Sequence, residues 1–296
     1  MFRGGKEMNI LKQFDEVLEY IEQNLLKEIK SEEIAKVAGC SWYAFQRMFS
    51  YIVGIPLSEY IRNRKMSNAG FELFESDNKV IDIALKYGYS SSNSFNRAFQ
   101  SVHGFPPSKA KEKRKELVVY PRIRLNISVS GDKSIKYRIE EKDEMIFLGK
   151  NYLLSEDIES NFQNTPLFWD DFVANNYLDK MLSQKECLDD YVYGIATYHE
   201  DKTNQYFIAL RCDKRANDNI YQQVIIPSQT WLILSNSGEM PEAMIQMYRK
   251  FYNEWLPVSD YEYDFNADIE VYPMYSSNTC EYELWLPIKR KEFNNE

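Results

Sequence analysis

A short stretch of this chain is written twice, and that repeat restricts the possible folds of the first third of the sequence. FQRMFSYIVGIP begins at Phe45, and FNRAFQSVHGFP begins at Phe95. An Ile-Ala pair, a glycine and a serine precede both stretches, at Ile34, Gly39 and Ser41 and again at Ile83, Gly88 and Ser91. A self-match at a fixed period indicates one supersecondary unit used twice.

Each copy has the pattern of a short helix, a glycine turn and a second helix. In the first copy, Ser31 can cap the first helix and Ser41 the second. Gly39 between them can end the first helix, because glycine adopts the left-handed conformation at low cost. The second helix then carries an apolar stripe at helical spacing, made of Phe45, Met48, Phe49 and Ile52. This is the helix-turn-helix pattern.

The side of each second helix opposite the apolar stripe carries residue types that read base edges. Arg pairs with guanine, and Asn or Gln with adenine. The candidate DNA-binding residues are Trp42, Tyr43, Gln46 and Arg47 in the first copy and Ser92, Asn93, Asn96 and Arg97 in the second. An alternative is two packed helical pairs that bind no DNA, as in a helical repeat protein.

The run after Pro56 predicts a long helix that separates the two copies. A helix of about 19 residues is about 28 Å long. Successive major grooves on one face of DNA lie about 34–36 Å apart. Two reading helices on one stiff body could therefore enter successive grooves, and we expect the duplex to bend slightly.

Charge distribution places any nucleic-acid binding in the first part of the chain. The chain carries a net charge of −9, but residues 1–120 hold 18 Lys and Arg against 15 Asp and Glu. Since an acidic protein does not attract polyanions everywhere, DNA would bind this mildly basic part. No apolar run is long enough to span a membrane and no secretory h-region opens the chain, which predicts a cytoplasmic protein. Four scattered cysteines and two histidines predict no disulfide frame, metal site or cofactor.

Residues 10–115 closely resemble the DNA-binding domain of AraC/XylS-type transcription regulators. The resemblance rests on IAKVAGCSWYAFQRMFSYIVGIPLSEYIRNRKM and IDIALKYGYSSSNSFNRAFQSVHGFPPSKAKEK. It implies promoter DNA as partner, with RNA polymerase as a second, and base contacts from Tyr43, Gln46, Arg47, Ser92, Asn93, Asn96 and Arg97. Ser50 and Gln100 stand where many members carry Lys or Arg. The N-terminal position of the domain is similar to the Rob-like subgroup.

The remainder of the chain predicts a second, α+β domain. Residues 1–116 form the expected all-α domain with two helix-turn-helix units, 117–134 a linker, and 135–296 the second domain. The basic run KAKEKRK before the linker is either a solvated charged face or a tail that contacts phosphates. Strand and helix patterns repeat as β-β-α-β-β twice, with helices expected at 165–182 and 241–255. Two such units would give an antiparallel sheet with helices on one face and a pocket between the halves.

The last strand raises the question of a ligand-binding carboxylate. Alternation puts Tyr282, Leu284 and Leu286 on one face, and Glu281, Glu283 and Trp285 on the other. Either the acidic face is ordinary solvent-exposed surface, or a carboxylate lies among aromatic rings, where a ligand cation would offset its desolvation.

CEYELWLPIKR and the strand layout also resemble the GyrI-like effector-binding domain of multidrug-responsive regulators. This resemblance implies a small cationic or amphipathic aromatic effector, with Glu283 as its contact. Candidate wall residues are Phe168, Trp169, Tyr193, Trp231 and Trp255. The combined prediction is a one-component transcription regulator that acts as an activator and is not an enzyme. Two alternatives stay open: a small-molecule hydrolase in the second domain, and a DNA-binding protein that ignores small molecules.

Overall fold

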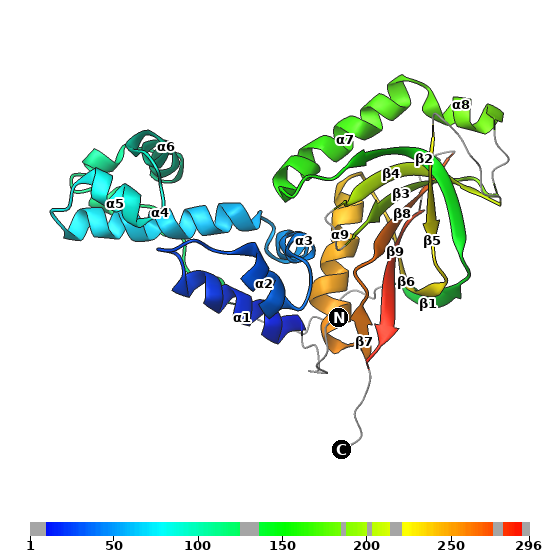
Figure 1. The fold of residues 1–296 in the computed structure, drawn as a ribbon, viewed down its shortest axis with the longest axis horizontal. Helices are drawn as coiled ribbons and strands as arrows, with labels where there is room; N and C mark the ends of the chain where they lie inside the picture. The colour runs from blue at the N-terminus through cyan, green and yellow to red at the C-terminus, as the bar shows by residue number, and fades with distance from the viewer. Residues whose placement is uncertain are drawn as a thin grey trace, which may run out of the picture. The chain divides into compact units, whose positions relative to one another are not determined.

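The chain divides into a helical unit, Met8–Ile127, and a second unit that holds Ser128–Glu296. The computed structural model describes residues 10–124, 136–184, 188–199, 203–213, 221–274 and 281–291. A helical first unit followed by an α+β unit confirms the predicted fold class (Figure 1). Within these residues, the structure contains no helix with the length and apolar character of a membrane span.

The helical unit is built from six α-helices in the order that the repeat predicts. Two short 3-10 turns, Pro107–Lys109 and Arg114–Glu116, follow the last of them. The helices are α1 (Ile10–Gln23), α2 (Ser31–Ala38), α3 (Trp42–Val53), α4 (Leu57–Glu75), α5 (Val80–Lys86) and α6 (Ser92–His103).

The turns of the two copies have the predicted chemistry. Gly39 and Gly88 have φ angles of +68° and +83°, which side chains with a Cβ rarely adopt. The side chains of Ser41 and Ser91 cap α3 and α6 by accepting hydrogen bonds from backbone amides three residues on. The prediction that Ser31 caps α2 was wrong. Ser31 is the first residue of the helix, and the N-cap position before it is Lys30, whose side chain makes no capping hydrogen bond.

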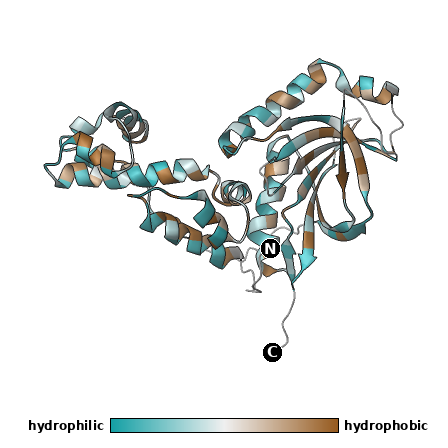
Figure 2. Ribbon diagram, in the orientation of Figure 1, coloured by the Kyte–Doolittle hydropathy of each residue, from teal (hydrophilic) through white to brown (hydrophobic). Residues whose placement is uncertain are grey.

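Aromatic rings hold each copy against the spacer helix α4. Phe49 of α3 lies 5.7 Å from the Phe14 ring and 5.6 Å from the Tyr60 ring. The second copy packs Phe95 and Phe99 of α6 in a buried cluster with residues of α4 and α5. Figure 2 shows hydrophobic and hydrophilic residues alternating along these helices, as expected for amphipathic elements. With 19 residues, α4 has the predicted length.

Residues 117–124, expected to begin the linker, instead pack on the helical unit. We call this segment the strap. The Tyr120 amide donates to Ser67 Oγ at 2.9 Å, and the Arg64 guanidinium donates to the Tyr120 carbonyl at 2.6 Å. The Val118 amide donates to His103 Nδ1 at 3.1 Å. The packed unit therefore extends beyond residue 116, through a segment that is not itself helical.

The second unit is one curved antiparallel sheet (Figure 1). Its order is β1-β6-β9-β8-β3-β4-β2-β5, with β7 paired to β9. The strands are β1 (Tyr137–Lys142), β2 (Met145–Leu153), β3 (Tyr191–Thr197), β4 (Gln205–Cys212), β5 (Gln222–Ile226), β6 (Gln229–Ser237), β7 (Tyr261–Tyr263), β8 (Ala267–Pro273) and β9 (Glu281–Arg290).

The sheet has two related halves, as the sequence predicts. The first half runs β1, β2, helices, β3, β4, and the second runs β5, β6, helix, β8, β9. If each strand is replaced by its counterpart in the other half, the same strand order is obtained, read from the opposite edge of the sheet. In this order β3 and β8 are adjacent at the centre. The two halves are therefore related by a pseudo-twofold axis between β3 and β8.

The helices of the two halves differ more than the sequence suggests. The first half carries α7 (Ile158–Ala174) and α8 (Tyr177–Gln184), where one helix from residue 165 was expected. Asp157 caps α7 early, by accepting from two backbone amides, and Pro166 is accommodated inside the helix. Asn176, with φ +52°, separates α7 from α8. The second half carries α9 (Glu242–Lys250), which continues as a π-turn, Phe251–Trp255.

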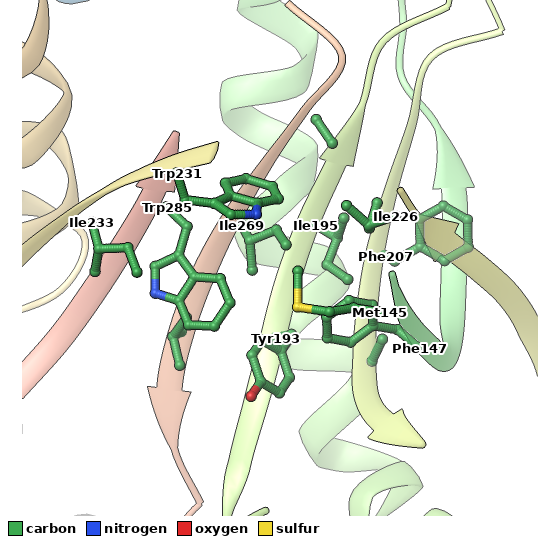
Figure 3. Packing of buried hydrophobic residues seen from close by; sticks show 13 residues of the cluster. Met145, Phe147, Tyr193, Ile195, Phe207, Ile226, Trp231, Ile233, Ile269 and Trp285 are labelled. Carbon is green, nitrogen blue, oxygen red and sulfur yellow. The ribbon is translucent and has the colours of Figure 1, made fainter. Parts of the chain in front are cut away.

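Both faces of the sheet are buried. One face packs against α7 and α8 through Leu148, Ile208 and Leu210, and α9 contacts β6 and β9 on the same face. The opposite face, which the sheet curves around, holds an aromatic core that includes Phe147, Tyr193, Trp231 and Trp285 (Figure 3). Residues on alternate strand positions thus belong to two separate cores.

Candidate functional site

The second reading helix presents its four candidate residues to solvent. Ser92, Asn93, Asn96 and Arg97 of α6 are exposed. On the other side of the same helix, Phe95 and Phe99 are fully buried. The buried stripe fixes the rotation of α6, so the polar side chains point away from the unit that carries them. Amide and guanidinium groups in this arrangement can donate and accept hydrogen bonds at base edges.

The first reading helix carries bulkier candidate residues. Trp42, Tyr43, Gln46 and Arg47 of α3 occupy the positions that Ser92, Asn93, Asn96 and Arg97 occupy in α6. The Arg47 guanidinium lies over the Tyr51 ring, 5.5 Å from its centre. Because its four candidate side chains are exposed, α6 is the helix on which base reading is tested first.

In the second unit, tyrosine hydroxyls converge on Glu270 at the centre of the sheet. Tyr206 of β4 and Tyr272 of β8 donate to Glu270 Oε2 at 2.8 and 2.9 Å. Tyr248 of α9 donates to Oε1 at 3.4 Å. Glu270 itself is half-buried. A carboxylate placed among hydroxyl donors remains ionised more readily than one placed among apolar groups.

Aromatic side chains of α7 extend this group of residues. The Trp169 indole donates to the Tyr206 hydroxyl at 3.0 Å and its ring lies 5.0 Å from that of Tyr272. The Phe168 ring lies 5.0 Å from that of Tyr152, whose ring is 6.0 Å from Tyr206. We call Glu270 with Tyr152, Phe168, Trp169, Tyr206, Tyr248 and Tyr272 the Glu270 site.

Asp268, two residues before Glu270 on β8, has a tyrosine environment of its own. Its carboxylate accepts from Tyr198 at 3.1 Å, from Tyr248 at 3.4 Å and from Tyr263. Asp268 is 1% exposed, which makes it far less accessible than Glu270. Tyr248 therefore lies between the two carboxylates, with one hydroxyl proton and two possible acceptors.

A glycine provides the room for the Glu270 carboxylate. Gly194 of β3 pairs directly with Glu270 across the pseudo-twofold axis. A Cβ on Gly194 would clash with the Tyr206 hydroxyl and come within 2.8 Å of Glu270 Oε2. The position that is Glu in one half is therefore Gly in the other, and the site holds a single carboxylate on the axis.

Burial and the nearby carboxylate both keep the surrounding tyrosines protonated. Burial, followed by the charge of Glu270, raises the pKa of Tyr206 well above its usual value. Burial also raises the pKa of Tyr152. At neutral pH these hydroxyls therefore remain hydrogen-bond donors rather than phenolates.

Glu283, the acid expected to contact a ligand, lies on the opposite face of the sheet. Its two oxygens accept from Arg138 of β1 at 2.8 and 3.1 Å, and from the Trp285 indole at 2.8 Å. This bidentate pair satisfies the carboxylate within the chain. The predicted alternation of β9 is correct, with Trp285 in the core that the sheet curves around and Leu284 and Leu286 fully buried on the other side.

The expected wall residues do not gather in one place. Phe168 and Trp169 belong to the Glu270 site. Tyr193 and Trp231 lie in the core on the other face, at 2% and 0% exposure (Figure 3). Trp255, at the end of the π-turn, packs edge-on against the Tyr137 ring at 6.0 Å.

Sequence reasoning missed Glu270, although β8 contains a signal. The strand ADIEVYP places Asp268, Glu270 and Tyr272 on one face and Ile269 and Val271 on the other. Carboxylates inside a strand whose other face is core indicate a polar site beneath the helices. Within the ranges described, no group of three or more residues could hold a metal ion.

Comparison with known proteins identifies relatives of both units. Residues 34–113 match a helix-turn-helix domain family, and residues 138–288 match the family described as integron-associated effector binding protein. The activator AarP of Providencia stuartii is 43% identical over 93 residues, which cover 31% of this chain and 69% of AarP. The uncharacterised regulator YbfP of Bacillus subtilis is 27% identical over 246 residues, covering 78% of this chain and 79% of YbfP.

A solved structure is similar to the second unit. SAV2435, determined with bound tetraphenylphosphonium, shares 16% identity and a TM-score of 0.45, and the match covers 52% of this chain and 94% of that one. The two family matches and the identity with AarP confirm the two resemblances on which the sequence interpretation relied.

Proposed function

Because this chain belongs to the AraC/XylS-type transcription regulators and joins their helix-turn-helix domain to an effector-binding domain of the integron-associated family, we propose that it is a transcription activator controlled by a cationic aromatic compound. Promoter DNA is the first partner, and RNA polymerase at the same promoter is the second. AarP, a relative of the helical unit, is named as a transcriptional activator, which supports this sign of regulation. The protein would act in the cytoplasm, where promoter DNA is.

Sequence-specific DNA binding is supported by the exposed polar face of α6. Asn96 and Arg97 lie one turn from the Ser92 end of this helix and are both exposed. A bidentate Arg or Asn contact discriminates against a wrong base by about 1–3 kcal/mol. We therefore assign base reading to α6, and to Tyr43, Gln46 and Arg47 of α3 by their equivalent positions in the repeat.

Selection of bound duplexes from a random DNA library tests this assignment. The wild-type protein should enrich two short blocks about one helical turn apart. Arg97→Ala should lose one block and retain the other, because only one reading helix is changed. Lys86→Ala is a suitable control, since the Lys86 ammonium is already paired with Glu72 of α4. Equal loss of specific and nonspecific binding in Arg97→Ala would show that Arg97 contacts phosphate and does not read bases.

A cationic aromatic effector is supported by the composition of the Glu270 site. Aromatic faces attract cations, and a carboxylate beneath them adds a full negative charge. Bringing a carboxylate and rings together is costly unless a positive charge offsets the desolvation. A large aromatic cation satisfies both demands, because it adds a full positive charge to the hydroxyl donors that Glu270 already has in Tyr206, Tyr248 and Tyr272, whereas a neutral or anionic compound adds none.

Titration with tetraphenylphosphonium, which combines a positive charge with four rings, tests the effector class. Trp169 lies in the site, so its fluorescence should report binding directly. Glu270→Gln should weaken binding by about tenfold or more, because it removes the charge and retains the shape. Glu283→Gln is the matched control on the other face of the sheet, and its affinity should stay near that of the wild type. If the two variants bind equally well, Glu270 is not the effector contact.

A further inference from the structure

His103 holds the end of the second reading helix to two other parts of the helical unit. It is the last residue of α6 and is 5% exposed. Its Nε2 lies 3.0 Å from the Met66 carbonyl of α4, and its Nδ1 accepts from the Val118 amide of the strap at 3.1 Å. Since an amide can only donate, Nδ1 must be unprotonated and Nε2 must carry the hydrogen. The ring is therefore neutral and joins α6, the middle of α4 and the strap.

The face of α4 beneath this contact is shaped to receive the strap. Gly70 lies inside the helix, where glycine is unfavourable. A Cβ there would lie 2.9 Å from the Leu117 side chain and 3.3 Å from two atoms of the His103 ring. One turn earlier, Ser67 is 2% exposed and accepts the Tyr120 amide. Small residues at Ser67 and Gly70 thus allow the strap and the histidine to approach the helix closely.

A second anchor holds the other end of the strap. Arg64 donates to both carboxylate oxygens of Glu22 in α1, at 2.8 and 2.7 Å, and to the Tyr120 carbonyl at 2.6 Å. Arg122 donates to Glu19 of α1 at 2.5 Å. The strap consequently connects α6 of the second copy to the spacer helix α4 and to α1, which precedes the first copy.

The first copy shows that a helix-turn-helix does not itself need this histidine. Val53 occupies the equivalent place at the end of α3. Gly54 and Gly104 cap α3 and α6 in the same way, each donating to the carbonyl four residues earlier. The capping is thus complete without a histidine, and the bonds of His103 serve something beyond the fold of the second copy.

We propose that His103 is a positioning residue for DNA reading, which sets the place of α6 on α4 through the docked strap and so fixes the spacing of the two DNA blocks. This inference rests on the proposed DNA-reading function. The strap is also where the chain leaves the helical unit toward β1. An effector-induced change in strap docking would therefore act first on α6, whose last residue His103 is bonded to the strap.

Two substitutions of His103 in the full-length protein test this role. His103→Leu keeps the bulk and removes both hydrogen bonds, whereas the amide of His103→Gln can donate to Met66 and accept from Val118. Binding is measured on the selected two-block site at its native spacing and with one base pair added or removed. For each variant, the spacing preference is its affinity for the native spacing divided by its affinity for an altered spacing. The proposed function is tested separately, by whether the wild-type protein binds the selected site at all.

His103→Leu should bind the native spacing about tenfold more weakly and discriminate less between spacings, and His103→Gln should restore both. The Val118 and Tyr120 amides should exchange hydrogen faster in the leucine variant. Unchanged spacing ratios in His103→Leu would overturn the proposal.

Gly70→Ala provides a second test, because a passive strap and a strap that positions α6 predict different effects on stability and on DNA binding. If α4 is a spacer and the strap a passive tail, alanine should make the helix more stable and leave DNA binding unchanged. If the strap positions α6, the added Cβ should displace Leu117 and His103 and reproduce the loss of spacing preference. A more thermostable Gly70→Ala with wild-type spacing ratios would contradict the role of the strap.

Discussion

Both units of this protein contain a duplicated motif, and the two duplications have diverged in different ways. In the sheet, the equivalent positions Gly194 and Glu270 are paired with each other across the pseudo-twofold axis. In the helical unit, the equivalent positions Val53 and His103 lie at the ends of separate helices, with α4 between the copies. The two halves of the sheet meet directly at β3 and β8, whereas the two helical copies are separated by α4.

This difference determines what each duplication can tolerate. Residues on a symmetry axis face their own equivalents, so a second Glu in place of Gly194 would put two carboxylates in one space. The two equivalent residues at the axis must therefore differ in type, here Gly194 and Glu270, before one of them can be an acid. The helical copies meet no such constraint, and His103 could be recruited to the strap without a matching change at Val53.

The largest effect should come from changing the small partner on the axis. In Gly194→Ala, the new Cβ would clash with the Tyr206 hydroxyl and press on Glu270. Overpacking of this kind costs about 1–3 kcal/mol of folding free energy, and we expect the variant to lose cation binding. Urea unfolding and titration with tetraphenylphosphonium would measure the two effects.

The clash itself can be relieved to check the cause. Tyr206→Phe removes the hydroxyl that the new methyl group meets first. Adding it to Gly194→Ala should recover part of the lost stability, so the two changes should be non-additive. Strict additivity, or a Gly194→Ala variant as stable as the wild type, would mean that β3 shifts easily and that the axis does not constrain the site.

A smaller effect should separate the two helical copies. His103→Val removes two hydrogen bonds and leaves the Val118 amide without its acceptor. We expect a loss of about 0.5–1.5 kcal/mol in the free energy of unfolding, the net contribution of a typical hydrogen bond. The reverse change, Val53→His, places a histidine at a half-buried position without a strap and should cost less than about 0.5 kcal/mol. Equal costs in thermal unfolding would show that the asymmetry between the copies is not due to the strap.

The helical unit could be predicted closely because its signals are local. Gly39, Ser41 and the stripe from Phe45 to Ile52 specify turn, cap and buried face within one short segment. The strap could not be predicted, because its partners Ser67 and His103 are distant in sequence and each looks ordinary alone. Small residues at i and i+3 inside a helix, here Ser67 and Gly70, were the available signal.

The ligand site could be predicted less well, because it depends on contacts between strands rather than on the pattern within one strand. Alternation correctly placed Trp285 and Glu283 on one face of β9, but it could not show that Arg138 of β1 reaches Glu283. That strand pairing depends on sheet order, which no single strand encodes. Glu270 likewise became a candidate only when Tyr206 of β4 and Tyr248 of α9 were found beside it.

The smallest expected effect is a pH dependence specific to the second helical copy. Burial lowers the pKa of His103 below its usual value, with the Met66 carbonyl partly opposing the shift. The unfolded chain therefore binds a proton at a higher pH than the folded one. The contribution of His103 to stability should be complete above about pH 6.5 and should decline as the pH falls toward its lowered value. Protonation would also place a second donor against the Val118 amide.

Urea unfolding at pH 7.5 and pH 5.5 measures this pH dependence. The loss of unfolding free energy between the two should be smaller in His103→Gln than in the wild type, because glutamine does not titrate. The same loss in both proteins would assign the pH dependence to other groups and leave the neutral ring without energetic consequence.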